Sequence, residues 1–191
     1  MLVKSVIRKE INEKRKNLSP TEIVDKSIAI IDNLMGLKEY EEADDIYTYV
    51  NYQNEVITTD LIEQTIAKGK RIYVPKVIGN EMNFFRIVTI DDLVEGYKGI
   101  LEPKEGLDKP GLFNNNYNKI MIMPGLAFDI NMHRIGYGGG FYDKYLDWNP
   151  MFTKIAICYD FQVLDEIPYE AFDQQPDIII TEERIIKKGD N

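Results

Sequence analysis

The sequence contains very little cysteine or histidine. Cys158 is the only cysteine among 191 residues, so no intramolecular disulfide can form, which suits a reducing compartment. We predict that Cys158 is a small residue of the core. His133 is the only histidine, and it is either a proton shuttle or, as we expect, a residue of a surface turn.

Long apolar runs and an excess of positive charge are also missing. No apolar stretch reaches the roughly 18 residues that a transmembrane helix needs. The N-terminus carries charged residues where a secretory signal would be apolar. The formal net charge of −9 disfavours binding to nucleic acid or to an anionic membrane. We therefore expect a cytoplasmic enzyme or binding protein for small molecules, in which local cations and backbone N–H groups hold any anionic ligand.

What is present indicates an α/β fold in a single domain covering residues 1–191. Residues 45–50 are typical of a strand, a helix is expected from 58–60 to Gly69, and residues 71–75 form a second expected strand. This spacing predicts a βαβ unit with a parallel pair. We expect a mainly parallel, Rossmann-like sheet flanked by helices. Further strands are expected at 82–88, 119–123, 154–159 and 177–181, with a loop-rich stretch over 91–118.

Two helices are expected at the N-terminus, over residues 2–17 and from Ser19 toward Leu34. The second begins with a capping box, because Glu22 follows Ser19 by three residues, and Gly36 ends it. In the first helix, Lys4, Arg8 and Arg15 fall in one narrow sector beside the apolar stripe. This sector is either a solvated basic edge or an edge that faces an anionic ligand.

A glycine-rich loop between a strand and a helix carries the main functional signal. The buried strand 119–123 ends at Pro124, and a helix is expected over 141–148. Between them, Arg134 precedes four glycines within residues 136–140, so that backbone N–H groups, a helix N-terminus and a full positive charge could serve a phosphate. Asp143 is then well placed to hold Mg²⁺ on that phosphate.

The loop matches neither common phosphate-binding motif. No Gly-Lys-Ser/Thr follows it, and Phe141 breaks the dinucleotide-binding spacing. A tight strand-to-helix turn with close packing is the alternative interpretation. A cluster of tyrosines before the helix expected from 58–60 is similarly open. Tyr47, Tyr49 and Tyr52 could stack on a flat ligand, and packing within the sheet is the alternative for Tyr47 and Tyr49.

The string Arg134-Ile-Gly-Tyr-Gly-Gly-Gly-Phe-Tyr-Asp143, preceded by Pro124-Gly-Leu-Ala-Phe-Asp129, resembles the signature of the 5-formyltetrahydrofolate cyclo-ligase family, also called methenyltetrahydrofolate synthetases. The resemblance covers nearly the whole chain. It departs at Met132, where the family often has glycine, and at Phe172, where it often has histidine. We expect Asn131 to adopt any left-handed conformation in that turn. Other agreements are Lys4, Arg8, Glu55 with the threonines after it, Pro75, Glu102, Pro103, Gln162, Pro168 and Asp173.

The resemblance implies an ATP-dependent cyclisation with Mg²⁺ as cofactor. ATP phosphorylates the formyl oxygen on N5 of 5-formyltetrahydrofolate, N10 attacks the activated carbon, and 5,10-methenyltetrahydrofolate, ADP and phosphate are released. A monomer or weak homodimer is expected. The implied catalytic residues are Arg134 and Tyr142, and the implied metal ligands are Asp143 and Asp173. The implied ATP-binding residues are Lys4, Arg8, Arg134, Ile135, Gly136, Tyr137, Gly138, Gly139, Gly140, Phe141 and Tyr142. The implied substrate-binding residues are Val50, Glu55, Tyr137, Gly138, Gly139, Gly140 and Phe141.

Two other classes of function compete with this interpretation. One is a folate- or nucleotide-binding regulator without turnover, which has little need of the two metal-binding carboxylates. The other is a sugar-phosphate isomerase or acyl-carrier transferase on a similar fold. That class needs a catalytic Glu or Lys in the loop, and residues 134–142 contain neither.

Overall fold

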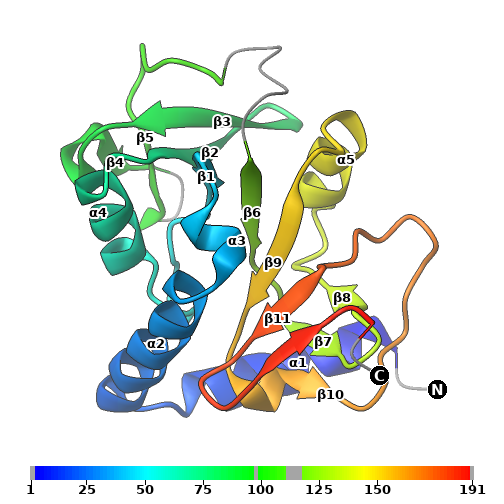
Figure 1. Ribbon diagram of the computed structural model, residues 1–191. Coiled ribbons are helices and arrows are strands. Elements are labelled where there is room, and N and C mark those ends of the chain that lie inside the picture. Colours follow the sequence, from blue (N-terminus) through cyan, green and yellow to red (C-terminus); the bar gives the residue numbers. More distant parts are fainter. Residues whose placement is uncertain (1–2, 97–98, 111–117, 190–191) are drawn as a thin grey trace.

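The computed structural model describes residues 3–96, 99–110 and 118–189. Within these residues, seven strands form the main sheet in the order β12-β11-β9-β6-β1-β2-β3 (Figure 1). The five inner strands are parallel, and the edge strands β3 and β12 are antiparallel to their neighbours. The strands are β1 (Asp45–Tyr47), β2 (Arg71–Ile78), β3 (Glu81–Ile87), β6 (Lys119–Met123), β9 (Thr153–Ile157), β11 (Ile178–Ile180) and β12 (Ile185–Lys187).

The predicted βαβ unit is confirmed. Strands β1 and β2 pair in parallel through the helix α4 (Thr59–Ala67), with Ile46 beside Ile72, and β1 also pairs in parallel with β6, with Ile46 beside Ile120. The expected strand 82–88 is β3, which returns antiparallel to β2 through a turn with Gly79 at φ +63°. The fold is therefore the mostly parallel α/β sheet with flanking helices that the sequence predicts.

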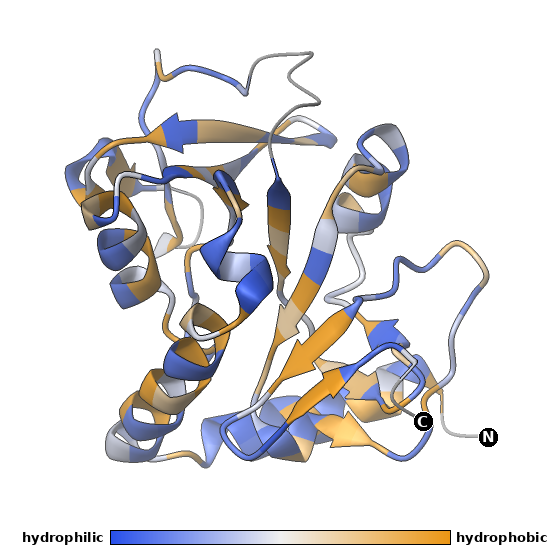
Figure 2. Ribbon diagram, in the orientation of Figure 1, coloured by the Kyte–Doolittle hydropathy of each residue, from blue (hydrophilic) through white to orange (hydrophobic). Residues whose placement is uncertain are grey.

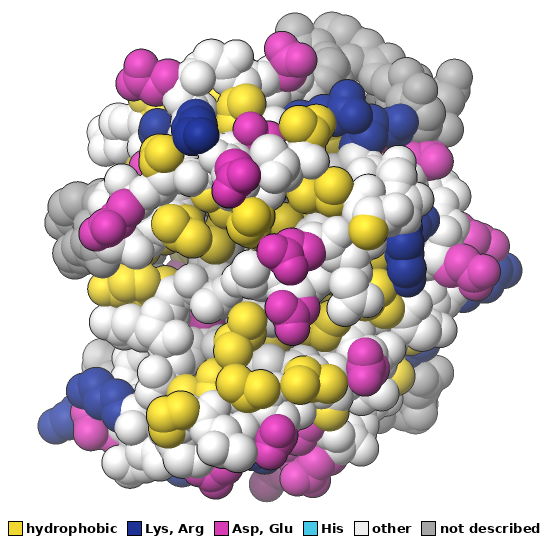
Figure 3. Space-filling view, turned by 90° about the vertical axis from the view of Figure 1, so that its left-hand side faces the viewer, with side chains coloured by type: hydrophobic (Ala, Val, Ile, Leu, Met, Phe, Trp, Pro, Cys, Tyr) yellow, Lys and Arg dark blue, Asp and Glu magenta, His cyan; other side chains and the backbone are white. Residues whose placement is uncertain are grey.

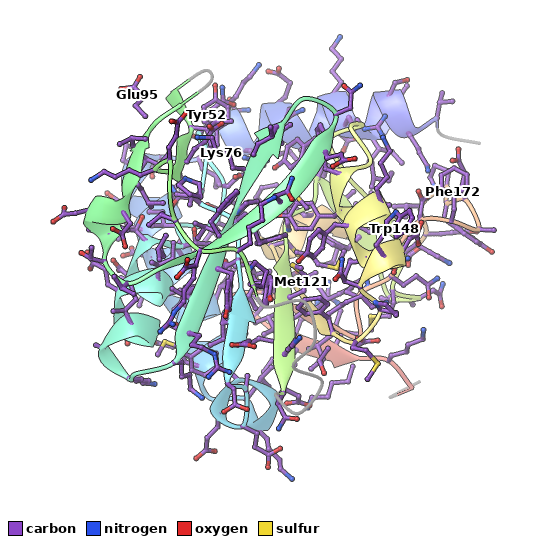
Figure 4. All side chains as sticks on the ribbon, turned by 90° about the horizontal axis from the view of Figure 1, so that it is seen from above. Tyr52, Lys76, Glu95, Met121, Trp148 and Phe172 are labelled. Carbon is purple, nitrogen blue, oxygen red and sulfur yellow. The ribbon has the colours of Figure 1, made fainter. Side chains whose placement is uncertain are left out.

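Alternation along the strands separates the two faces of the sheet. In β6, Ile120 and Ile122 pack in the same cluster as α2 (Pro20–Met35), α3 (Lys38–Glu41) and α4, whereas Met121 and Met123 pack with α5 (Phe141–Trp148). Figure 2 shows the apolar strands between helices of mixed polarity, and Figure 4 shows Met121 beneath α5. Because parallel strands end at one edge, the segments after β1, β6, β9 and β11 converge there.

A second, smaller sheet lies at this edge and was not predicted. Strand β7 (Ala127–Asp129) pairs with β8 (Arg134–Ile135) and with β10 (Val163–Leu164). Helix α1 (Lys4–Lys16) packs Ile7 and Ile11 against this sheet (Figure 1). The N-terminal helix therefore lies beside the loop that follows β8. The remaining elements are the hairpin β4 (Leu93–Glu95) and β5 (Leu101–Pro103) and the 3-10 turns η1 (Ile90–Asp92) and η3 (Asp160–Gln162).

The predicted start of α2 is confirmed, but the expectation that Asn131 is the left-handed residue of the β7–β8 turn is wrong. The capping box of α2 is present, since Ser19 Oγ accepts from the Glu22 N–H at 3.2 Å and Glu22 Oε2 accepts from the Ser19 N–H at 2.8 Å. The expected start of the first helix at residue 2 lies outside the described residues. The left-handed residue of the turn is Met132, at φ +69°, and not Asn131. The Met132 side chain is 2% exposed and packs with Phe128, so core packing offsets the backbone strain.

Among the described residues, none of the helices has both the length and the apolar character that crossing a membrane would require.

Candidate active site

The glycine loop joins β8 to α5 and leaves the start of this helix open. Gly138 has φ +102° and Gly140 has φ +63°, conformations that glycine adopts without the strain of a side chain. Gly140 is the N-cap of α5, and no side chain caps the helix there. The first amide groups of α5 are therefore available to an anion, which the helix dipole also favours.

Arg134 and Asp143 form an ion pair across this loop. Arg134 is 5% exposed, and its Nη2 donates to Asp143 Oδ1 at 2.7 Å. Its Nη1 also donates to the Pro124 carbonyl at 3.3 Å. A Cβ on Gly136 would lie 3.1 Å from Nη1, so a larger residue there would crowd the guanidinium. Asp143 Oδ1 accepts a second bond, from the Gln174 N–H at 2.9 Å, which joins α5 to the loop before β11.

The basic edge of α1 faces the site. Lys4 Nζ donates to Asp173 Oδ2 at 2.7 Å and lies 3.7 Å from Glu170 Oε1. Arg8 Nε donates to the Gly136 carbonyl at 2.9 Å. Arg15 Nη1 donates to the Tyr137 hydroxyl at 2.7 Å. All three side chains contact the glycine loop or the loop before β11, so the edge is not simply a solvated surface.

A hollow beside the loop contains the glutamate that the sequence assigned to the substrate. Its lining includes Arg15, Glu55, Tyr137 and Gln162. The Tyr137 hydroxyl donates to Glu55 Oε1, and the Tyr52 N–H donates to Glu55 Oε2 at 2.8 Å. Burial raises the pKa of Glu55, although the Tyr137 and Tyr52 hydrogen bonds and the Arg15 charge act in the opposite direction.

A larger hollow, of about 350 Å³, lies between α2 and α4 on another face of the molecule. Its lining includes Val24, Ile28, Asp32 and Asp60 and no Lys or Arg. Figure 3 looks onto this side of the molecule, where apolar and acidic side chains lie close together. A hollow with two aspartates and no cation does not suit a phosphate, so the loop after β8 remains the candidate site.

Tyr142 is near enough to Glu55 and to Arg134 to interact with the charge of each. Its hydroxyl is buried and has no hydrogen-bond partner among the described residues, and its ring stands edge-on to Phe84 at 6.4 Å between centroids. Burial raises the pKa of Tyr142, the Glu55 charge raises it further, and the Arg134 charge opposes this. A neutral hydroxyl without a partner is a donor that a ligand oxygen could satisfy.

Hydrogen bonds join six of the predicted site residues to residues 136–140 or to one another: Lys4, Arg8, Glu55, Arg134, Asp143 and Asp173. Ile135 is buried in the core beneath α1, and Val50 is buried as well. Its side chain is 7% exposed and packs in the core with Tyr49 and Val56. Tyr47 likewise belongs to the core, where its ring stacks on Tyr73 at 4.6 Å. Phe172 lies at the periphery and is 67% exposed (Figure 4). Cys158 is 1% exposed, which confirms the prediction of a core residue.

The sequence does not predict the contacts that fix the residue next to Arg134. Asp129 is fully buried, and its Oδ1 accepts from the His133 N–H at 2.9 Å while Oδ2 accepts from the Ile167 N–H at 3.1 Å. His133 lies in the turn as expected, but its ring is packed, with Nδ1 2.9 Å from Asp129 Oδ2 and the plane stacked on Tyr169 at 3.6 Å. The side chain next to Arg134 is thus held in place, and no local pattern in the sequence indicates these contacts.

The fold and the site define an α/β protein with a glycine-rich loop, two ion pairs beside it and an adjoining hollow at the carboxyl edge of a mostly parallel sheet. Residues 1–182 match the model of the 5-formyltetrahydrofolate cyclo-ligase family. The chain belongs to this family, it is an enzyme with the cyclo-ligase activity of that name, and the family implies ATP as cosubstrate.

Curated relatives and solved structures agree over nearly the full length. The chain is 30% identical to a probable 5-formyltetrahydrofolate cyclo-ligase of Schizosaccharomyces pombe, covering 97% of this chain and 98% of the relative. A cyclo-ligase of Haemophilus influenzae is 29% identical over 87% of this chain and 91% of its own. The structure of 5,10-methenyltetrahydrofolate synthetase from Aquifex aeolicus superposes with a TM-score of 0.85 at 32% identity, covering 100% of this chain and 95% of that one.

Proposed function

We propose that the enzyme activates the formyl group of 5-formyltetrahydrofolate by phosphorylation. ATP transfers its terminal phosphoryl group to the formyl oxygen, N10 attacks the formyl carbon, and the oxygen leaves with phosphate. The products are 5,10-methenyltetrahydrofolate, ADP and phosphate. The chemical reason is that an amide-type oxygen is a poor leaving group, whereas a phosphate ester of it is a good one. The observation that carries the proposal is the Arg134–Asp143 pair at the open start of α5.

The ATP phosphates are assigned to the glycine loop and to the cations around it. Phosphoryl transfer demands positioning and charge neutralisation more than covalent chemistry. The Gly136–Gly140 backbone supplies N–H groups, and Arg134 supplies a full charge with a fork of donors that matches phosphate oxygens. Lys4 and Arg8 approach from α1, on the edge that faces the loop.

Magnesium is assigned to Asp143 and Asp173. The Gln174 N–H bonds to Asp143, which brings the neighbour of Asp173 against α5. The described residues contain no group of three or more His, Cys, Asp or Glu that could hold a metal by themselves. Two carboxylates nonetheless fit Mg²⁺, because this ion usually takes one or two and completes its shell with phosphate oxygens and water. When bound there, the ion would offset the charge of the phosphates.

The proposed phosphate ligands and the proposed metal ligands form ion pairs with each other. Lys4 pairs with Asp173, and Arg134 pairs with Asp143. Mg²⁺ and ATP can replace both partners at once, because the ion takes the carboxylates while the phosphates take the cations. Either ligand alone would leave one kind of charge without its partner, which is costly at a largely buried site. The proposal therefore includes the joint binding of Mg²⁺ and ATP.

The folate is assigned to the hollow beside the loop. Glu55 has two oxygens with two lone pairs each, so each oxygen can accept from the amino group or ring N–H of a pterin while it keeps its bond from the Tyr137 hydroxyl or the Tyr52 N–H. The Tyr137–Phe141 backbone forms the adjoining wall, and Val50 supports it from the core. Tyr142, with its unpartnered hydroxyl, is proposed to donate to the oxygen that passes between folate and phosphate.

The test is turnover of 5-formyltetrahydrofolate by the purified protein. We expect methenyl absorbance to rise only when ATP and a divalent ion are both present, with one ADP formed per methenyl product. Equal turnover without ATP would contradict the proposal. Hydrolysis of ATP without methenyl product would contradict the assignment of 5-formyltetrahydrofolate as the acceptor of the phosphoryl group.

A further inference from the structure

Arg15 is a buried cation on the apolar stripe of α1. Ile7, Ile11 and Arg15 follow one another at four-residue spacing, and all three are buried, with Arg15 5% exposed. A charged residue in such a position needs partners, because an unpaired buried charge is strongly destabilising. The apolar stripe thus ends in a positive charge, and that charge lines the hollow beside the glycine loop.

The partners of Arg15 belong to the two segments that form the folate half of the site. Its Nε donates to the Asn54 carbonyl at 3.1 Å, and its own carbonyl accepts from Asn54 Nδ2 at 2.8 Å. Its Nη1 donates to the Tyr137 hydroxyl at 2.7 Å, and the guanidinium carbon lies 6.0 Å from the centre of that ring. Arg15 therefore fastens the loop that contains Glu55 to the glycine loop.

The hydroxyl of Tyr137 stands between a cation and a carboxylate. A phenol has one proton to donate, and here it goes to Glu55 while the oxygen accepts from Arg15. The arrangement fixes the direction of both hydrogen bonds. Without Arg15, the hydroxyl would lose its donor and Glu55 would lose the opposite charge behind it.

We propose that Arg15 is a positioning residue for the folate substrate, which acts through the Tyr137 hydroxyl to hold the Glu55 carboxylate toward the hollow, ready for the N–H edge of a pterin. The inference rests on the proposed role of Glu55. It gives the third basic residue of the α1 edge a place in the folate half of the site, while Lys4 and Arg8 lie toward the phosphates.

The charge of Arg15 also bears on the protonation of Glu55. Burial raises the pKa of this carboxyl, and Arg15 is the cation that lowers it. The other titratable groups that interact with the Glu55 charge are tyrosines, whose own pKa values are raised, so they remain neutral: Tyr49, Tyr137, Tyr142 and Tyr159. Removing Arg15 lets the pKa of Glu55 rise further. Folate binding then weakens at a higher pH than in the wild type, because only the carboxylate accepts at both oxygens.

The experiment compares Arg15→Met with Arg15→Lys and with the control Lys9→Met. Lys9 is an exposed cation of the same helix, so the control loses the same charge away from the hollow. We expect Arg15→Met to raise the KM for 5-formyltetrahydrofolate roughly tenfold, the scale of a lost hydrogen bond that involves one charged group. The KM for ATP and kcat should stay close to wild type. The loss should grow as the pH is lowered, and Arg15→Lys should recover part of it.

Thermal melting and ATP binding will show whether Arg15→Met folds. A second variant tests the inference even if Arg15→Met misfolds. Tyr137→Phe cuts the same connection at the hydroxyl and keeps the ring. It should cause the same folate-specific loss, and Arg15→Lys should add little in the Tyr137→Phe background because both act through one contact. A wild-type folate KM in Tyr137→Phe would overturn the inference.

Glu55→Gln separates the failure of this inference from failure of the proposed function. If Glu55→Gln raises the folate KM while Arg15→Met behaves like Lys9→Met, Arg15 has no positioning role although Glu55 binds the substrate. If none of these variants changes the folate KM, the assignment of folate to this hollow is wrong as well.

Discussion

The Arg134 guanidinium donates to the Asp143 carboxylate at 2.7 Å across the glycine loop, so a proposed phosphate ligand and a proposed metal ligand form an ion pair. A second ion pair, Lys4 with Asp173, likewise joins a proposed phosphate ligand to a proposed metal ligand. The first pair joins the neighbouring elements β8 and α5, whereas the second joins α1 to the loop before β11, 169 residues away. The proposed cationic and anionic ligands of the site therefore neutralise each other.

The first prediction concerns the metal. Asp143→Asn and Asp173→Asn should each raise the Mg²⁺ concentration for half activity by at least roughly tenfold, since losses of that size follow even from changes behind the metal ligands. Their effects should not add, because both act through one ion. Asp147→Asn is the matched control, since Asp147 accepts from the Gln174 side chain at 2.8 Å one helical turn further along α5. A magnesium titration of the wild type, the two single variants, their double variant and Asp147→Asn, with Mg²⁺ binding measured with and without ATP, tests this.

Unchanged magnesium dependence in both single variants would remove the metal role and leave Asp143 as the partner of Arg134. Tight binding of Mg²⁺ without ATP would contradict the joint replacement of the two ion pairs.

The second prediction concerns Arg134. Arg134→Ala should lower kcat by roughly 10²-fold or more, the scale of losing one donor that acts in the transition state. Arg134→Lys should recover only part of this, because an ammonium lacks the planar fork. Steady-state kinetics with both substrates test it, and circular dichroism checks that the fold survives. An alanine variant with wild-type kcat would place Arg134 outside the chemistry.

The third prediction concerns Glu55 and pH. The pKa of Glu55 is raised, so its carboxylate is lost on acidification earlier than for an exposed glutamate. Folate affinity of the wild type should fall as the pH drops through this raised pKa. Glu55→Gln should bind folate more weakly at neutral pH, lack this pH-dependent fall, and bind ATP almost normally. Binding titrations with each ligand over a range of pH test it. A fall in ATP affinity instead would mean that the two ligands are assigned to the wrong ends of the site.

The fourth prediction separates the function of the loop from its backbone strain. Gly140 and Gly79 both have φ +63°, and a Cβ on either would have no atom within 4 Å. Alanine at each should therefore cost a similar free energy of unfolding, about 1–2 kcal/mol for a left-handed residue. Only Gly140→Ala should raise the KM for ATP, because Gly140 is the N-cap of α5, whereas Gly79 lies in the turn between β2 and β3. Thermal melting and kinetics of the two variants test this, and equal kinetics would remove the loop from the ATP site.

Much of the fold follows from local signals in the sequence. The helix over Phe141–Trp148 was predicted at its observed bounds, because glycines precede it and its apolar residues keep helical spacing. The small sheet was missed, since strands of two or three residues such as β8 show no periodicity and depend on contacts with α1. Met132 was missed for a related reason, because its left-handed conformation is offset by burial in a core that the sequence does not display.

The site residues likewise include some contacts that the local sequence predicts and others that depend on the fold. Arg134 and Asp143 lie nine residues apart in one glycine-rich string, so their association could be predicted locally. Lys4 and Asp173 are 169 residues apart, and only the resemblance to a family placed both at the site. The sequence places Arg15 on a basic edge of the first helix. Its contact with Tyr137 joins segments 122 residues apart, so it could be found only from the fold.

The most direct measurement follows the formyl oxygen of 5-formyltetrahydrofolate labelled with ¹⁸O. We expect the label to appear in the inorganic phosphate, one labelled oxygen for each methenyl product, because the phosphoryl group is transferred to that oxygen and leaves with it. Label found in water, with unlabelled phosphate, would contradict the phosphorylation of the formyl group.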